Sequence, residues 1–161
     1  MSGMTKLATL PEGLHGLWAA FDDLSARQVH GLLKMRQDVF MLEQNCLFPE
    51  IDGKDPEALH FLLMQEDGVV SAAVRIFLAD DAGLETRIGR VVVSKAWRGK
   101  RLGDYLMAEA VKKVGELRPG QPIHLSAQAH LEAFYAGFGF QRSSDLYLED
   151  GIEHVDMIRP S

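Results

Sequence analysis

The segment that decides the fold is Val91-Val92-Val93-Ser94-Lys95-Ala96-Trp97-Arg98-Gly99-Lys100-Arg101-Leu102-Gly103. Its β-branched start predicts a strand, and the basic, glycine-containing turn that follows leads directly into an amphipathic helix. The first N–H groups of a helix have no partner within the helix, so they favour an anion at its N-terminus. The segment therefore predicts a strand, a turn suited to binding a diphosphate, and a helix.

The length, net charge and hydrophobicity of the chain limit the classes of protein to which it can belong. A length of 161 residues fits a single domain, which we expect over residues 1–161, with residues 1–12 as a loosely ordered N-terminal extension. The 17 Lys and Arg against 23 Asp and Glu give a net charge of -6, which argues against nucleic-acid binding. No apolar run is long enough for a membrane span and no signal peptide is visible, so we expect a cytoplasmic protein that binds no membrane.

Periodicity and turn residues predict the remaining elements. Ser25 and Gln28 have capping-box spacing for a helix that reaches Phe40, and an irregular loop rich in carboxylates follows over residues 45–56. Further helices are predicted at 102–117 and 131–138, and strands at 17–21, 59–65, 69–78, 86–93, 123–127, 140–148 and 152–158. This order predicts an α/β (α+β) fold with a mixed, mostly antiparallel central sheet flanked by helices on both faces.

Two motifs in the right order resemble the GNAT superfamily of N-acetyltransferases. Residues Arg98 to Gly103 are similar to its acetyl-CoA-binding motif Arg/Gln-x-x-Gly-x-Gly/Ala, with Arg101 where the family usually has its middle glycine. Downstream, Phe134-Tyr135 followed by Gly139-Phe140 is similar to the family's Phe-Tyr-x-x-x-Gly-Phe pattern. From the residues alone, the first motif could also be a basic turn whose cations are merely solvated.

Four further segments resemble the ElaA-like branch of GNAT proteins, so that the resemblance extends from about Leu17 to Arg159. They are Phe40-Met41-Leu42-Glu43-Gln44-Asn45-Cys46 with Ile51-Asp52-Gly53, Ile88-Gly89-Arg90-Val91-Val92-Val93-Ser94, Ala127-Gln128-Ala129-His130-Leu131, and Glu149-Asp150-Gly151-Ile152-Glu153-His154. The resemblance implies the GNAT fold.

The resemblance also implies an activity: direct transfer of an acetyl group from acetyl-CoA, as co-substrate, to a primary amine. A backbone N–H of the strand around Val92 would face the thioester carbonyl, and Tyr135 would be the general acid for the CoA sulfur. The alternative for Tyr135 is an aromatic anchor that binds a backbone carbonyl. The residues that would bind the cofactor are Val91, Val92, Val93, Arg98, Gly99, Lys100, Arg101, Leu102 and Gly103.

The general base is less clear from the sequence. Arg90 occupies the strand where a number of GNAT enzymes place a carboxylate. Glu43 and His130 are the candidates, with solvation of Glu43 and capping or packing by His130 as the alternatives. His60 and His154 are lesser candidates, and the substrate ammonium could also lose its proton to solvent before it binds.

Arg75 and Arg90 come from neighbouring strands and could bind an anionic group of the substrate, with surface pairing to Asp or Glu as the alternative. No metal site is expected, because the six histidines show no i,i+4 pair and Cys46 is the one cysteine. A serine hydrolase is also disfavoured, because no Gly-x-Ser-x-Gly motif occurs.

Two other functions remain compatible with the sequence. One is a non-catalytic acyl-CoA-binding sensor on the same fold, favoured by Arg101 and by the missing strand carboxylate. The other is an interaction protein whose turn binds only incidental anions. For the enzyme, the acceptor could be a small-molecule or peptide amine. The C-terminal hairpin offers an edge through which a homodimer could form.

Overall fold

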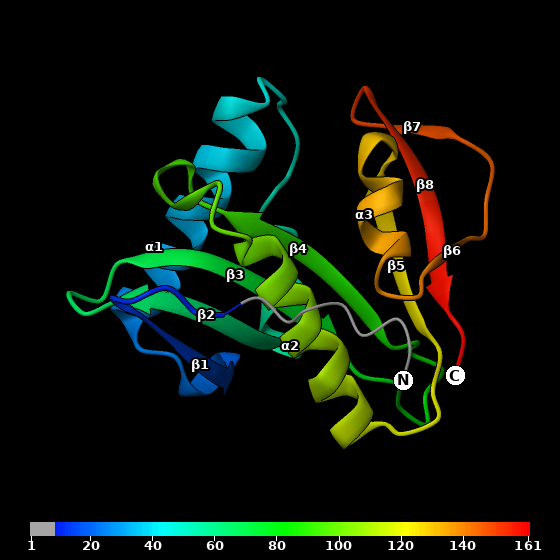
Figure 1. The fold of residues 1–161 in the computed structure, drawn as a ribbon, viewed down its shortest axis with the longest axis horizontal. Coiled ribbons are helices and arrows are strands. Elements are labelled where there is room, and N and C mark those ends of the chain that lie inside the picture. The colour runs from blue at the N-terminus through cyan, green and yellow to red at the C-terminus, as the bar shows by residue number, and fades with distance from the viewer. Residues whose placement is uncertain (1–8) are drawn as a thin grey trace.

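Eight strands form one sheet, and three α-helices cover its two faces, within residues 9–161, the part of the chain that the computed structural model describes (Figure 1). The helices are α1 (Ala26–Gln37), α2 (Leu102–Leu117) and α3 (Glu132–Ala136). The strands are β1 (Leu14–Ala20), β2 (Leu59–Gln65), β3 (Val70–Phe77), β4 (Arg87–Val93), β5 (Ile123–Gln128), β6 (Gln141–Arg142), β7 (Tyr147–Glu149) and β8 (Ile152–Arg159). The extension expected over residues 1–12 lies largely outside the described residues and stays a prediction.

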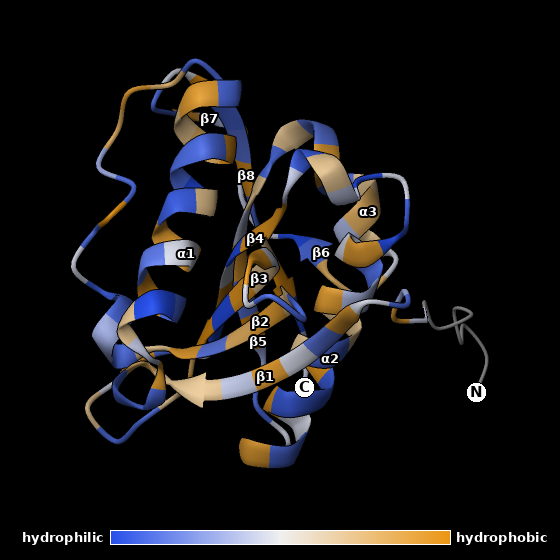
Figure 2. Cartoon of the chain, turned by 90° about the vertical axis from the view of Figure 1, so that its left-hand side faces the viewer, coloured by the Kyte–Doolittle hydropathy of each residue, from blue (hydrophilic) through white to orange (hydrophobic). Residues whose placement is uncertain are grey.

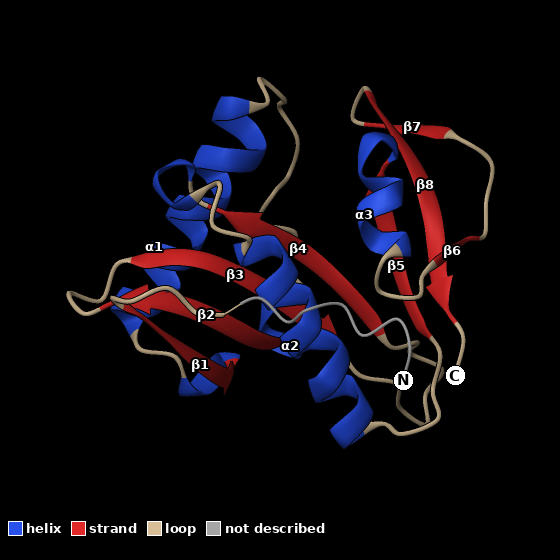
Figure 3. Ribbon diagram, in the orientation of Figure 1, coloured by secondary structure: helices blue, strands red, loops and turns tan. Residues whose placement is uncertain are grey.

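The sheet is mixed and mostly antiparallel, as the sequence predicts (Figure 3). The strand order is β1-β2-β3-β4-β5-β8-β6, with β7 paired to β8. Strands β4 and β5 are parallel, and the other pairs are antiparallel. Within residues 9–161, Arg87 and His124 are the one pair in register between β4 and β5, so these strands separate toward their C-terminal ends.

Apolar side chains alternate between two clusters, one on each face of the sheet. In β2, Phe61 and Leu63 belong to the cluster under α2 and α3, whereas Leu62 and Met64 belong to the cluster under α1. This alternation follows from the period of two residues along a strand that is covered on both sides. Figure 2 shows the sheet between α1 on one side and α2 and α3 on the other.

The N-terminal part of the fold confirms the predicted helix start. Ser25 Oγ accepts a hydrogen bond from the Gln28 backbone N–H at 3.1 Å, and Gln28 Oε1 accepts one from the Ser25 N–H at 2.8 Å. The helix continues past α1 as a π-type turn at Asp38–Glu43, a distortion that is common near functional sites. The predicted irregular loop follows directly and ends in a 3-10 turn at Asp55–Glu57.

Strand β1 begins at Leu14, before the predicted start at Leu17. Its pairing with β2 runs from Ala20 opposite Leu59 to Leu14 opposite Gln65, so contact with a neighbouring strand overrides the weak local pattern. Gly16 permits this pairing, because a Cβ at Gly16 would come within 2.7 Å of the Phe61 ring.

The C-terminal part contradicts one prediction, because residues 140–148 form two short strands, β6 and β7, instead of one. One serine side chain interrupts the pairing with β8: Ser144 Oγ accepts a hydrogen bond from the Asp156 backbone N–H at 2.8 Å. The helix predicted at 131–138 is also divided, into a 3-10 turn at Ala129–Leu131 and the short α3. Gly139, with a φ of 91°, lies in the left-handed region and prevents the helix from continuing.

Candidate active site

A pocket of about 600 Å³ opens where β4 and β5 separate. Its walls come from β3, β4, β5, α3, the loop after α1 and the turn between β7 and β8. Strand β4 has a bulge at this point, because Ala73 pairs with Val92 and Arg75 with Gly89, which leaves Arg90 and Val91 opposite Val74 alone. A bulge leaves its extra residue unpaired and bends the strand, and Arg90 has a left-handed φ of 51°.

The pocket reaches both faces of the sheet. Tyr135 belongs to the apolar cluster under α2 and α3. Gln128 and His154 pair across β5 and β8 and point to the opposite face, because their neighbours Ala127 and Val155 point into that cluster. Since Tyr135, Gln128 and His154 all line the pocket, two ligands could enter from opposite faces and meet between β4 and β5.

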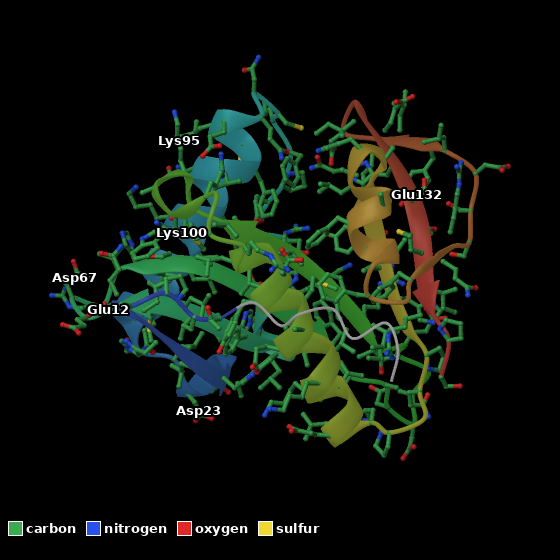
Figure 4. All side chains as sticks on the ribbon, viewed as in Figure 1. Glu12, Asp23, Asp67, Lys95, Lys100 and Glu132 are labelled. Carbon is green, nitrogen blue, oxygen red and sulfur yellow. The ribbon has the colours of Figure 1, made fainter. Side chains whose placement is uncertain are left out.

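The turn between β4 and α2 has the features of an anion-binding site. The N-cap residue Arg101 has φ 59° and ψ 31°, a left-handed conformation, and Gly99 has a φ of 81°. The Tyr105 N–H donates to Arg101 O at 3.2 Å, so the N–H groups of residues 102–104 precede the helical hydrogen bonds of α2. Lys95 and Lys100 project from the same segment (Figure 4). These features fit a diphosphate.

Arg98 also belongs to this turn, but its side chain folds back onto the protein. Its Nε and Nη2 atoms donate to Val93 O at 3.3 and 3.2 Å, and its Nη1 atom lies 2.7 Å from Glu43 Oε2. Arg98 therefore joins the end of β4 to the end of the turn after α1.

The conformation of Arg101 leads to a test of stability. A left-handed backbone costs a side-chain-bearing residue about 1 kcal/mol relative to glycine. We expect R101G to be more stable than R101A by about 1 kcal/mol in urea unfolding, because both variants lack the guanidinium and only glycine is free of strain. Equal midpoints for the two variants would show that the turn stores no strain at Arg101.

The two sequence motifs lie next to each other. A Cβ built on Gly103 would lie 3.5 Å from Phe134 Cζ, so α3 packs against the N-terminus of α2. Phe134 also packs edge-on against Tyr135, with ring centroids 5.0 Å apart. Tyr135 is 8% exposed and lines the pocket, and burial raises its pKa to about 12. Its phenol is therefore protonated at neutral pH and can donate a hydrogen bond into the pocket.

The structure does not bring the two predicted base residues to this pocket. The carboxylate of Glu43 pairs with Arg98 and lies in a separate groove between α1 and the segment after β4. His130 lies in the 3-10 turn before α3 and is exposed to solvent, outside the set of residues that line the pocket with Tyr135. Their roles as base stay predictions.

The loop of residues 45–56 is attached to α1 through a buried arginine. Arg36 is 1% exposed; its Nε atom lies 2.5 Å from Glu50 Oε1 and its Nη1 atom 2.7 Å from Asp55 Oδ1. Both carboxylate residues are buried as well, at 3% and 4% exposure. Burial alone would lower the pKa of Arg36, but hydrogen bonds and charge from both carboxylates outweigh burial and raise the pKa.

Arg75 and Arg90, predicted to bind a substrate anion, line the pocket and are paired with carboxylates of the same loop. Arg75 lies 2.6 Å from Asp52 Oδ2 and 2.8 Å from Asp55 Oδ1, and Arg90 Nε lies 3.0 Å from Glu50 Oε2. Pairing with acids, the alternative considered from the sequence, is thus present, and for Arg75 it is buried instead of at the surface. Arg90 keeps 24% of its side chain exposed, and its role toward a substrate stays a prediction.

The histidines ranked lower by the sequence have very different positions. His60 is 1% exposed, and its Nε2 atom lies 2.9 Å from Asp55 O, so the ring supports the loop. Burial lowers the pKa of His60. His154 lines the pocket instead. The sequence could have indicated that His154 points away from the core. Alternation along β8 predicts that His154 and Asp156 share the face opposite the core residues Val155 and Met157.

Two kinds of feature are missing from the described residues 9–161. No group of three or more His, Cys, Asp or Glu side chains there is arranged to hold a metal ion. None of the helices described is both long enough and apolar enough to span a bilayer.

The family follows from comparison with known proteins. A family model described as an acetyltransferase (GNAT) domain matches residues 22–159. The chain belongs to the GNAT acetyltransferase family. The split between parallel strands, the basic turn before α2 and the neighbouring Phe134-Tyr135 are therefore features of a GNAT domain, and the GNAT family binds acyl-CoA.

Relatives of this GNAT protein include ElaA of Escherichia coli, 42% identical over 139 residues that cover 85% of this chain and 90% of ElaA. The crystal structure of E. coli ElaA matches with a TM-score of 0.83 and covers 91% and 99% of the two chains. The structure of an acyl-CoA N-acyltransferase from Pseudomonas aeruginosa matches with the same TM-score, 36% identity and the same coverage. A UPF0039 protein of Mycobacterium tuberculosis is 41% identical over 155 residues, 94% of this chain and 95% of the relative. The predicted ElaA-like branch is confirmed.

Proposed function

We propose that this GNAT protein transfers an acetyl group from acetyl-CoA directly to a primary amine. The observation that carries the proposal is the pocket that passes through the sheet between β4 and β5, with the anion-binding turn and Tyr135 beside it. Acetyl-CoA would lie on the α2–α3 side, its diphosphate at residues 98–103 and its thioester against β4 at residues 91–93. The amine would enter from the side of the loop of residues 45–56. We also propose a cytoplasmic location.

The chemistry needs no covalent intermediate on the protein. The bulge leaves part of β4 unpaired, and an N–H there would stabilise the oxyanion that forms when the amine attacks the thioester. As the carbon–sulfur bond breaks, Tyr135 would donate its hydroxyl proton to the sulfur. A phenol with a pKa of about 12 is a weak acid, so its main contribution is a hydrogen bond that strengthens as charge develops on sulfur.

Release of free CoA thiol from acetyl-CoA, measured over a panel of small amines, amino acids and peptides, tests the proposal. Turnover that requires an amine supports it, and parallel reactions with longer acyl-CoA thioesters would define the acyl group. Tight binding of acetyl-CoA without turnover of any amine would contradict it and favour the acyl-CoA sensor. No preference for CoA over inorganic pyrophosphate would favour the interaction protein.

The Tyr135→Phe variant tests the acid. It removes the hydroxyl and keeps the packed ring, so we expect kcat to fall by about 100-fold while the Kd for acetyl-CoA, measured by calorimetry, stays the same. Tyr105→Phe is the matched control, because Tyr105 lies on α2, stacks on Phe61 and does not line the pocket. If Y135F turns over as fast as Y105F, Tyr135 has no part in the proton transfer.

A further inference from the structure

An ammonium substrate must lose a proton before its nitrogen can attack the thioester, and a group on the acceptor side of the pocket could accept that proton. At neutral pH an alkylamine with a pKa of about 10.4 is almost entirely protonated and has no lone pair to attack a carbonyl. Tyr135 cannot fill this role, because it belongs to the opposite face and is itself protonated. The structure places neither Glu43 nor His130 in this pocket.

His154 is a histidine of this face that lines the pocket, and its ring is held on two sides. The residue is 9% exposed, and its ring stacks on Tyr147 with centroids 5.9 Å apart and planes 24° apart. Tyr147 is fixed in turn, because its hydroxyl donates to Asp156 Oδ1 at 2.6 Å. The side chain is therefore positioned before any ligand binds.

A hydrogen bond also fixes the tautomer of His154. Nδ1 lies 2.7 Å from the backbone carbonyl oxygen of Ile152. A carbonyl oxygen only accepts, so Nδ1 carries the hydrogen, and Nε2 of the neutral ring holds the lone pair. The carboxylate of Glu149, 56% exposed, lies 3.6 Å from Nε2. This arrangement offers a cation both a negative charge and a proton acceptor.

On the basis of the proposed function, we propose that His154 Nε2 accepts the proton of the acceptor ammonium, with Glu149 attracting the ammonium beside it. The nitrogen lone pair that is freed forms the bond to the thioester carbon, and the electron pair of the broken carbon–sulfur bond leaves with sulfur. Sulfur receives the proton of Tyr135. The nitrogen loses a second proton as the amide forms, and this proton replaces the one that Tyr135 gave to sulfur. The proton on His154 passes to solvent.

The charged groups around His154 determine which kind of ligand can bind beside its ring. Glu149 faces Nε2 from β7, and Asp156 is linked to the ring through Tyr147. On the β5 side the facing residue Gln128 is neutral and bonds to Gln44 at 3.3 Å. Arg90 lines the same pocket from β4 and is paired with Glu50. The charged group that faces Nε2 is thus a carboxylate, which favours an incoming ammonium.

The variant His154→Asn separates support of the turn from proton transfer. The Asn amide can still donate to Ile152 O, but it has no group at the position of Nε2. We expect kcat/KM for an amine acetylated by the wild type to fall by about 100-fold at pH 7. The loss should shrink as the pH approaches 10, because the free amine becomes abundant. The Kd for acetyl-CoA should not change.

Glu149→Gln should raise KM for the amine by about tenfold with little change in kcat, since it removes an attracting charge and not the acceptor of the proton. Glu153→Gln is the matched control, because this substitution removes the same charge from a nearby position on β8. Glu153 does not line the pocket. Equal KM values for E149Q and E153Q would overturn the role of Glu149.

The tautomer can be measured without any substrate, by long-range ¹H–¹⁵N NMR of the wild-type protein. Hydrogen on Nδ1 and a free Nε2 are expected, and the opposite tautomer would overturn the proposal. So would wild-type turnover by H154N at pH 7. A wild type that binds acetyl-CoA and acetylates no amine would instead overturn the proposed function, and this inference with it.

Discussion

Replacing Gly103 with glutamate should weaken acetyl-CoA binding by about 100-fold or more. Gly103 is the second residue of α2, where free N–H groups and neighbouring cations favour an anion. A carboxylate about 4 Å from a diphosphate charge costs on the order of 4 kcal/mol near a protein surface, and 2.7 kcal/mol corresponds to about 100-fold in Kd. Calorimetric titration with acetyl-CoA measures the loss directly.

Gly103→Gln is the control for this prediction, because it adds nearly the same volume without the charge. A Cβ at Gly103 would make only ordinary contact with Phe134, at 3.5 Å, so the fold should tolerate either side chain. We expect G103Q to bind acetyl-CoA at least about tenfold more tightly than G103E. If both variants bind as the wild type does, the diphosphate does not lie at this turn.

The elements and the strand–turn–helix at residues 91–103 could be predicted because their signals are local. The capping box at Ser25 and the apolar face of α2 each depend on residues a few positions apart, and the structure has them where the sequence predicts. Arg101 illustrates the limit of a motif. Its side chain is unusual at a glycine position, yet its backbone adopts a left-handed φ, a conformation that glycine reaches without strain.

The side of the pocket that faces the loop of residues 45–56 could not be predicted, because it depends on contacts between distant residues. Nothing local indicates that Arg36, on a helix, pairs with Glu50 and Asp55. The sequence alone would place the carboxylates of such a loop in solvent. In the same way, the side chain of Glu43 is oriented by its ion pair with Arg98, and that of His130 by the short turn before α3. Strand alternation predicts the face of β8 on which His154 lies, but only the fold shows that this face meets the pocket.

Replacing Arg36 with methionine should destabilise the protein by about 3–5 kcal/mol, because two carboxylates lose a partner where little water reaches them. Methionine keeps the helix propensity and much of the side-chain volume, so the loss reports the guanidinium. Lys34→Met is the matched control in the same helix. Lys34 pairs with Asp38 at 2.7 Å but is 66% exposed, and such pairs contribute about 0–1 kcal/mol. Urea unfolding of both variants at pH 7 makes the comparison.

The pH dependence of R36M supplies a second measurement of the same network. Burial alone would raise the pKa of Asp55, but hydrogen bonds and charge from Arg36 and Arg75 outweigh burial and hold this pKa below its usual value. A carboxylate whose pKa is lowered by folding stabilises the protein above about pH 4, and this contribution disappears as the pH falls through the folded pKa. The stability difference between wild type and R36M should therefore narrow from pH 5 toward pH 2. A constant difference would show that Arg36 stabilises the loop by packing and not by charge.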